Sequence, residues 1–164
     1  MRCGPPAILV LSLLQAAAAS PAKQACHPFD AAEVRQLLHI PVGQPEGTAG
    51  AAMFSCTARS GERTVTLSYT AEPDPMLGSA GEFNQSVERA RAVGKVEVQE
   101  FKETRCAFLL PSGGSKFGAF KSWCVLHSKK GRAVSLEVLA PGAKQLPPLE
   151  KVRTLAEAAA ARIP

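Results

Sequence analysis

The sequence predicts an α+β fold, in which two or three helices pack on one face of an antiparallel sheet of about five strands. Three observations predict this class. Apolar and polar residues alternate along several short segments, as they do in strands with one buried face. Short turns join these segments, and short turns connect antiparallel neighbours. Three segments with apolar residues at helical spacing lie before, between and after the strands, as in domains whose helices cover a sheet.

The clearest hairpin spans Phe117–Leu139. Phe120, Ser122, Cys124 and Leu126 share one parity, and the odd-numbered residues from 119 to 127 form the opposite face of the strand. The segment SKKGR then interrupts the alternation, and Gly131 can supply the positive φ of a tight turn. Alternation resumes after the turn, so we expect these two strands at the centre of the sheet.

Two further pairs of segments have strand character. Met53–Arg59 and Thr64–Thr70 are predicted to form a second hairpin, whereas Val42–Ala52 is rich in Gly, Pro and Ala and is predicted to be a loop. Lys95–Glu103 is strand-like but charged, which is typical of an edge strand. Cys106–Leu110 alternates again and forms the next strand.

Three helices follow from capping residues and apolar stripes. Asp30 is expected to cap the first helix, which Pro41 ends. Ser79 is expected to cap the second, with Gly94 just past its end. The third is Ala-rich, begins at Pro148 and has an apolar stripe formed by Leu149, Val152, Leu155, Ala156 and Ala159.

Residues 1–22 have the features of a secretory signal peptide. Arg2 precedes an apolar run, Ala7–Ala19, and small residues suited to cleavage follow. An uncleaved N-terminal anchor is the alternative, but the run is shorter than the roughly 20 residues that a spanning helix requires. We therefore expect a secreted or periplasmic protein, with residues 23–164 as a single α+β domain without a transmembrane segment.

Four cysteines follow the predicted signal peptide, and an even number in an exported chain predicts two disulfides. Four cysteines allow three pairings, and free buried thiols are a further alternative. The preferred pairing is Cys26–Cys56, which would tie the first helix to the first strand, and Cys106–Cys124, which would tie two later strands.

The whole chain has a net charge of +5. Its positive charge is concentrated in one segment. The span from Thr104 to Ser135 holds no acidic residue. On the predicted hairpin, Lys121 and Trp123 point to one face, which we expect to be open to solvent; the alternative is that a helix or loop covers Trp123. With the basic turn, this face predicts a binding surface made of Lys121, Trp123, Lys129, Lys130 and Arg132.

Recognised catalytic patterns are missing from the sequence. There is no G-x-S-x-G elbow, and the histidines lack the spacing of metal ligands, so no cofactor or metal is expected. The segment PSGGSK lacks the spacing of a phosphate-binding loop and is predicted to be a surface connector. A nucleophilic Ser112 or Ser115 with Lys116 as its base is the alternative.

The order of these motifs resembles a known group of proteins. The chain reads C-x-x-F-D-A-A-E-V-R-Q-L-L-x-x-P-V-G over Cys26–Gly43, followed by Cys56, the hairpin Ser122–Val138 and an Ala-rich helix. This layout is similar to small exported bacterial α+β proteins of unknown function, including relatives of actinobacterial envelope lipoproteins. The resemblance covers most of residues 23–164 and implies the fold and an envelope location, but no catalytic residues. The chain departs from it by lacking a lipobox.

Together these features predict an exported, non-catalytic binding domain that contacts an anionic partner through a basic and aromatic sheet face. Export argues against nucleic acid as the partner. The expected partner is therefore an envelope protein or an anionic polymer. Two alternatives remain from the sequence: an inhibitor or immunity-type protein that acts on an exported enzyme, and a hydrolase with a Ser or His site that the sequence does not locate.

Overall fold

The computed structural model describes residues 20–112 and 119–164. Residues 1–19 of the predicted signal peptide, and Ser115 and Lys116 of the PSGGSK segment, lie outside the described residues. The elements in chain order are α1 (Pro21–Cys26), α2 (Ala31–Leu38), β1 (Glu46–Ala49), β2 (Met53–Ser60), β3 (Arg63–Thr70), α3 (Ala80–Arg91), β4 (Gly94–Glu100), β5 (Arg105–Pro111), β6 (Phe120–His127), β7 (Ala133–Ala140), the 3-10 helix η2 (Ala143–Gln145) and α4 (Leu149–Arg162).

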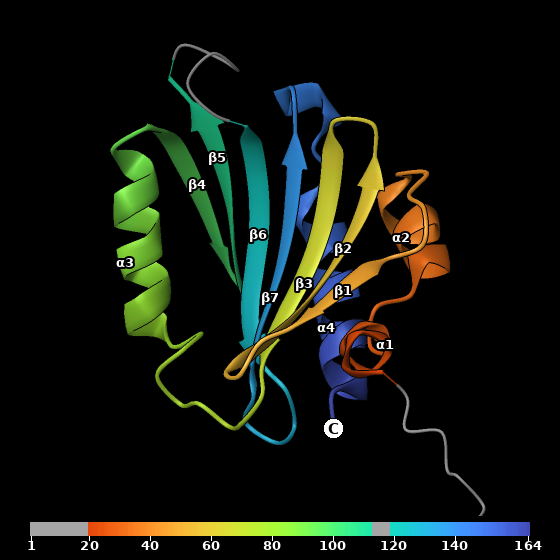
Figure 1. Cartoon of the computed structure of the whole chain (residues 1–164). Coiled ribbons are helices and arrows are strands. Elements are labelled where there is room, and N and C mark those ends of the chain that lie inside the picture. The colour runs from red at the N-terminus through yellow and green to blue at the C-terminus, as the bar shows by residue number, and fades with distance from the viewer. Residues whose placement is uncertain (1–19, 113–118) are drawn as a thin grey trace, which may run out of the picture.

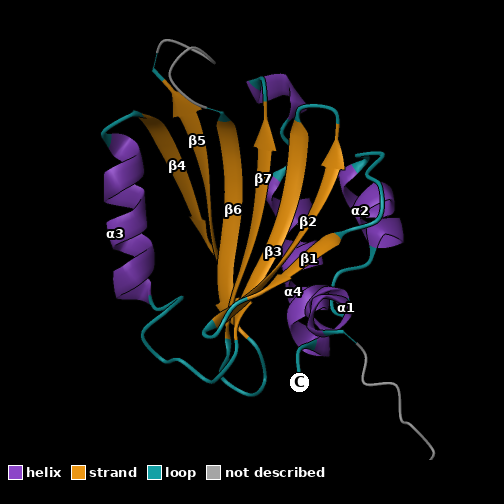
Figure 2. Cartoon of the chain, in the orientation of Figure 1, coloured by secondary structure: helices purple, strands orange, loops and turns teal. Residues whose placement is uncertain are grey.

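The strands form one antiparallel sheet in the order β1-β2-β3-β7-β6-β5-β4 (Figures 1 and 2). The predicted hairpins are confirmed as β2–β3 and β6–β7, and Gly131 has the expected positive φ of 78°. The charged strand β4 lies at an edge, as predicted. The sheet has seven strands rather than about five, so the predicted strand count is too low.

Strand β1 lies within the segment that the sequence predicts to be a loop, and that prediction is wrong there. Its sequence, EGTA, has no apolar alternation of its own. It is a strand because it pairs with β2 on one side and packs closely against α1. A Cβ atom on Gly47 would collide with the carbonyl of Ala22, so only glycine permits this approach.

Helices cover both faces of the sheet, which corrects the prediction that they cover one. Helices α1, α2 and α4 lie on one face, and α3 lies on the other, over β4, β5 and β6 (Figure 1). We call the α4 side the back face and the α3 side the front face. The front face of β2, β3 and β7 has no helix over it among the described residues.

Each face has its own hydrophobic core. The back core is the larger one and includes the predicted stripe of α4, all of it buried, packed against apolar residues of β2, β3, β6 and β7. The front core is small and consists of Phe83, Val87, Ala107 and Trp123. Helix α3 is therefore held by a few large side chains.

Both preferred disulfides are confirmed. Cys26 in α1 bonds to Cys56 in β2, and Cys106 in β5 bonds to Cys124 in β6. Cys106 and Cys124 are direct partners in the strand register, whereas the first bond closes a loop between a helix and the sheet. The first disulfide therefore attaches α1, and the second joins two neighbouring strands.

The predicted caps are also confirmed. Asp30 accepts a hydrogen bond from the N–H of Ala32 at 2.7 Å, and Ser79 accepts one from the N–H of Glu82 at 3.3 Å. Gly94 has a different role from the predicted one, because it begins β4. A Cβ atom there would collide with the carbonyl of Leu110 in β5, so the glycine permits strand pairing at the end of the sheet.

Candidate functional site

Trp123 is not on an open surface, so its predicted exposure is wrong and the alternative, that a helix covers it, is correct. Its side chain is 5% exposed. The parity prediction holds, since Trp123 lies on the face opposite Cys124, but α3 covers that face. The Phe83 ring of α3 lies 6.3 Å from the Trp123 ring, centroid to centroid. Trp123 is a core residue of the front face.

Lys121 lies beside Trp123, and its charge is largely compensated. Its Nζ stands 5.0 Å from the centroid of the Trp123 ring, within cation–π distance. The same ammonium forms an ion pair with Glu137 of β7, and each side chain is 31% exposed. Lys121 is therefore not a free cation for an anionic partner.

The predicted binding residues fall into two groups. Lys129 and Lys130 are exposed at the β6–β7 turn, and Arg132 is half-buried just after it. Lys121 lies near the other end of β6, and a strand rises about 3.3 Å per residue, so about 20 Å separates Lys121 from the turn. The structure brings the three cations of the turn together but leaves Lys121 and Trp123 elsewhere.

The basic turn is held in place by the loop between β3 and α3. Within the turn, the N–H of Ser128 donates to the carbonyl of Arg132 at 2.8 Å. The N–H of Asp74 donates to the carbonyl of Gly131 at 3.1 Å. His127 Nε2 lies 3.1 Å from the carbonyl oxygen of Asp74. These contacts fix the turn against the loop rather than leaving it free in solvent.

Asp74 organises that loop, and this leads to a first prediction. Its carboxylate accepts hydrogen bonds from the N–H groups of Leu77 and Met76, at 3.0 and 2.9 Å, and these bonds lower its pKa from the usual 3.8. A lowered folded-state pKa means that the carboxylate stabilises the fold above pH 3.8, and that this contribution disappears as the pH falls.

We therefore expect Asp74→Ala to lower the urea midpoint at about pH 7 and to have a smaller effect at about pH 3, where part of the contribution of the carboxylate has been lost. Asp74→Asn keeps an acceptor oxygen but not the charge. Its urea midpoint at about pH 7 should therefore lie between those of the unchanged protein and Asp74→Ala. An equal loss for Asp74→Ala at both pH values would contradict this role for the ionised carboxylate.

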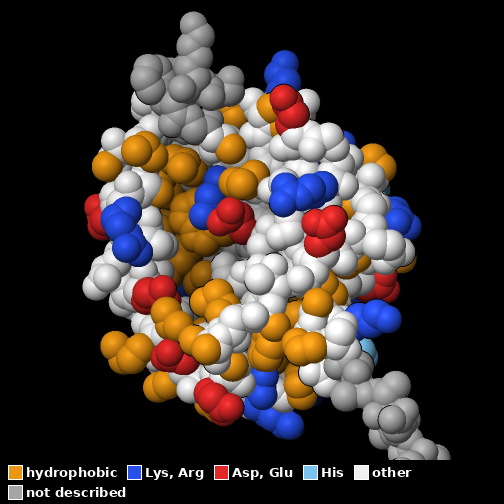
Figure 3. Space-filling model, in the orientation of Figure 1, with side chains coloured by type: hydrophobic (Ala, Val, Ile, Leu, Met, Phe, Trp, Pro, Cys, Tyr) orange, Lys and Arg blue, Asp and Glu red, His pale blue; other side chains and the backbone are white. Residues whose placement is uncertain are grey.

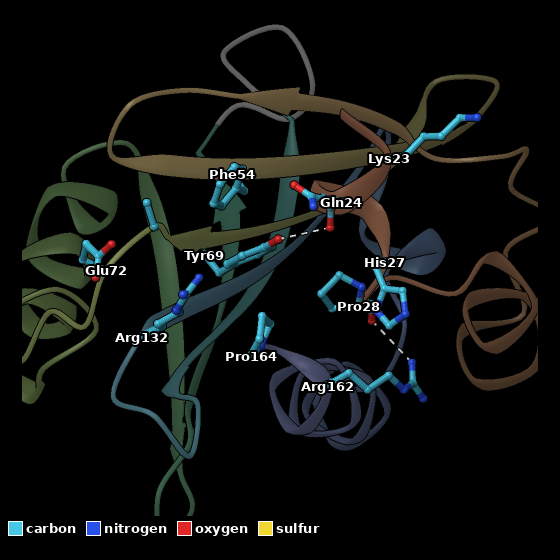
Figure 4. Close-up of a pocket in the computed structure, with 11 residues that line it drawn as sticks. Lys23, Gln24, His27, Pro28, Phe54, Tyr69, Glu72, Arg132, Arg162 and Pro164 are labelled. Atoms are coloured by element: carbon cyan, nitrogen blue, oxygen red, sulfur yellow. Dashed lines mark hydrogen bonds between the residues drawn. The ribbon is translucent and has the colours of Figure 1, made fainter. Parts of the chain in front are cut away.

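Arg132 lines a cavity of about 760 Å³ (Figure 4). This volume is in the usual range of ligand sites. The cavity lies where α1, the end of α4 and the β6–β7 turn meet. Its lining consists of Lys23, Gln24, His27, Pro28, Phe54, Tyr69, Ala71, Glu72, Arg132, Arg162 and Pro164.

Two aromatic rings form one wall of this cavity. The rings of Phe54 and Tyr69 are 5.2 Å apart and inclined by 37°. The hydroxyl of Tyr69 donates to the carbonyl of Gln24 in α1 at 3.4 Å. Burial raises the pKa of the Tyr69 hydroxyl, and the positive charge of Arg132 opposes that increase. The hydroxyl thus stays neutral at ordinary pH and lies within the field of Arg132.

Positive charge predominates around the cavity. Arg162 is already occupied, because it makes two hydrogen bonds to the carboxylate of Glu33 in α2. Arg132 points into the cavity toward Tyr69, whereas Lys23 extends away from it (Figure 4). Among the described residues, Arg132 makes no ion pair with a carboxylate. Its guanidinium is therefore available to an anionic group from outside.

The sequence identified Arg132 but not its neighbours in the cavity. Tyr69 and Phe54 have the inward parity of β3 and β2, which indicates core residues and no binding role, and Gln24 gave no signal. These residues lie in three separate elements, and only the tertiary fold brings them to Arg132. The signal available in the sequence was a tyrosine at an inward strand position, because buried tyrosines retain a polar group that requires a partner.

The histidines predicted to lack metal-ligand spacing lie in different surroundings. His39 Nε2 lies 2.9 Å from Lys151 Nζ, His127 contacts Asp74, and His27 lines the cavity. Residues 20–112 and 119–164 contain no group of three His, Cys, Asp or Glu side chains that could hold a metal ion.

Within the described part of the chain, no helix has the length and apolar character that crossing a membrane requires. Comparison with known proteins adds no relative: no family model, curated protein or solved structure matches this chain.

Proposed function

We propose that this chain is an exported, non-catalytic binding domain that contacts an anionic partner at the basic turn and the adjoining cavity. The observation that carries the proposal is the position of Arg132, whose half-buried guanidinium points into a cavity with an aromatic wall and has no carboxylate partner among the described residues. A cation beside aromatic rings in a concave site is a common arrangement for holding an anionic group.

This proposal moves the contact from the sheet face to the end of the sheet. The sequence paired the basic turn with Trp123, but Phe54 and Tyr69 are the aromatic residues that stand next to Arg132. Lys129 and Lys130 lie on the same turn, where they are exposed and can attract an anion to the cavity mouth. The proposed site is thus Lys129, Lys130 and Arg132 with the aromatic wall.

The proposed partner is an envelope protein that inserts an acidic segment into this cavity. A finite cavity with one inward cation suits a single carboxylate side chain or chain end better than a long uniform polymer. Secretion or a periplasmic location remains part of the proposal, and the two disulfides support it, because disulfides persist in oxidising compartments.

An inhibitor of an exported enzyme is a second candidate, favoured by the β6–β7 turn. Two exposed lysines occupy its tip, and its backbone is fixed by hydrogen bonds to the loop that contains Asp74. A preorganised turn loses little conformational freedom when it binds, which is an advantage for inhibition.

A pulldown from envelope extract tests the proposal. We expect Arg132→Ala to weaken recovery of the specific partner about tenfold, since a charge-assisted hydrogen bond is lost. The triple variant Lys129→Glu/Lys130→Glu/Arg132→Glu should abolish recovery, and high salt should weaken it for the unchanged protein. Arg89→Ala, which removes an exposed arginine from α3, is the matched control.

Equal recovery by the unchanged protein and the triple variant would overturn the proposed site. Recovery of a polysaccharide or another anionic polymer instead of a protein would keep the site but change the class of partner. Recovery of an enzyme whose activity falls on binding would select the inhibitor candidate.

A further inference from the structure

A second cavity lies on the front face, away from Arg132. It has a volume of about 320 Å³ and lies between α3 and the part of the front face that no described helix covers. Figure 3, in the orientation of Figure 1, shows a hollow beside α3 with apolar side chains along it. A basic and an acidic side chain lie next to each other at its margin, and uncharged polar surface continues over the middle strands.

The strand register makes the sheet face beside this groove a regular array of polar side chains, of which Ser68 and Ser135 line the groove itself. Ser55, Ser68 and Ser135 are successive partners across β2, β3 and β7. Thr57, Thr66 and Glu137 are successive partners in the adjacent row. Residues two apart on a strand share a face, so these six side chains all lie on the front of the sheet.

These hydroxyl groups retain unused hydrogen-bonding capacity. The Oγ atoms of Ser55 and Ser68 lie 3.2 Å apart, and the Oγ1 atoms of Thr57 and Thr66 lie 3.1 Å apart. Each pair uses one donor, which leaves one donor and several lone pairs for solvent or a ligand. All four side chains are only half-buried.

Two charged residues line the groove, and each has a partner: Glu82 accepts a hydrogen bond from the N–H of Gly78, and Lys121 pairs with Glu137 of β7. Lys121 and Glu137 form an ion pair at the end of the polar rows, and each remains about one-third exposed. The carboxylate still has lone pairs and the ammonium still has donors. This end of the groove can therefore hydrogen-bond a polar ligand without selecting for net charge, in contrast to the cavity of Arg132.

Part of the lining is apolar, on α3, the loop before it and β6, although Glu82 and Ser86 of α3 also line the groove. Leu77, Phe83 and Val125 line the groove together with Trp123, and Met53 stands at its margin with 45% of its surface exposed. A groove with an apolar wall and a hydroxyl-bearing floor matches a ligand that has C–H groups on one side and hydroxyl groups on the other.

We propose that this groove binds a neutral saccharide. A sugar ring presents C–H groups that can pack on Leu77 and Phe83, while its hydroxyls can exchange hydrogen bonds with Ser68, Ser135 and Lys121. The volume is near the lower end for ligand sites, which fits one or two rings rather than a long chain. This site is separate from the proposed anion site and does not depend on it.

The experiment is a titration of the ¹⁵N-labelled protein, with residues 23–164 present, using tri-N-acetylglucosamine and maltotriose as separate probes. We expect at least one probe to shift amide resonances of β3, β7 and α3 at concentrations up to about 10 mM, and to leave the β6–β7 turn unshifted. The two probes differ in the acetamido group, whose methyl can contact the apolar wall.

Variants make the test specific to the groove. Ser135→Ala and Ser68→Ala should each weaken binding about tenfold, because each removes a partner of a sugar hydroxyl. Thr154→Ala removes an exposed hydroxyl from α4, on the back face, and should leave affinity unchanged. Absence of shifts with both probes, or shifts that cluster around Arg132, would overturn the proposal, and failure of the pulldown above would not affect it.

Discussion

Replacing Cys26 and Cys56 together by alanine is expected to lower the free energy of unfolding by about 3–4 kcal/mol at 25 °C. The two residues are 30 positions apart in sequence, so the disulfide removes much conformational freedom from the unfolded chain. A domain of this size has a stability of about 5–15 kcal/mol, so the variant should still fold with a lower urea midpoint.

The same substitution should also affect the anion site, because this disulfide attaches α1 to the sheet. Helix α1 and the residue after it contribute Lys23, Gln24 and His27 to the cavity. Without the disulfide, the Tyr69 hydrogen bond to Gln24 and the packing of α1 on β1 must hold that wall. We expect partner recovery to fall even under conditions where the variant is folded.

Cys106→Ala/Cys124→Ala is the matched control for this result. Its loop is shorter, with 18 positions between the cysteines, and its expected stability loss is similar, about 3 kcal/mol. Neither residue lines the cavity, so partner recovery should be retained while the variant is folded. Equal loss of recovery in both double variants would show that general destabilisation, not the position of α1, is responsible.

Trp123→Ala is expected to destabilise the protein by about 3–5 kcal/mol, as large-to-small changes of buried aromatic residues do. Trp123 is the largest side chain of the front core, and Phe83 of α3 packs against it. The variant leaves a cavity directly under α3, where few other apolar side chains hold the helix. Chemical unfolding followed by circular dichroism measures the loss.

Hydrogen exchange distinguishes a local effect from a global one. In Trp123→Ala, the amides of α3 should exchange faster than those of α4, because α4 packs on the separate back core. Trp123→Phe keeps an aromatic ring, so it should lower the free energy of unfolding by less than half as much as Trp123→Ala. A loss below about 1 kcal/mol for the alanine variant would mean that Trp123 is effectively a surface residue, as the sequence suggested.

Much of this fold follows from local patterns in the sequence. Alternation located β2, β3, β6 and β7, and the caps at Asp30 and Ser79 located two helices. The preferred disulfides were right, because the first ties the first helix to β2 and the second ties two neighbouring strands, as the order of the predicted elements suggested. Each of these inferences depends on residues close together in the chain or on the period of a single element.

The errors arise where a distant part of the chain decides the outcome. Parity placed Trp123 on the face opposite Cys124, but the sequence of β6 does not indicate whether a helix covers that face. Strand β1 has no strand pattern and depends on Gly47 fitting against α1. For the candidate site, the sequence located Arg132 from charge alone, whereas its aromatic neighbours come from strands whose arrangement only the tertiary structure provides.

The junction of β3 with β7 has a consequence for how the chain reaches its native state. The N–H of Ala133 donates to Thr70 Oγ1, and these residues are 63 positions apart. The sheet therefore consists of two locally connected meanders that meet only after β7 has been synthesised. Until then, β3 presents an unpaired edge in the middle of the future sheet, where it can associate with other chains. Such non-local closure favours slow folding and makes protection of the nascent amino-terminal meander a requirement of the topology.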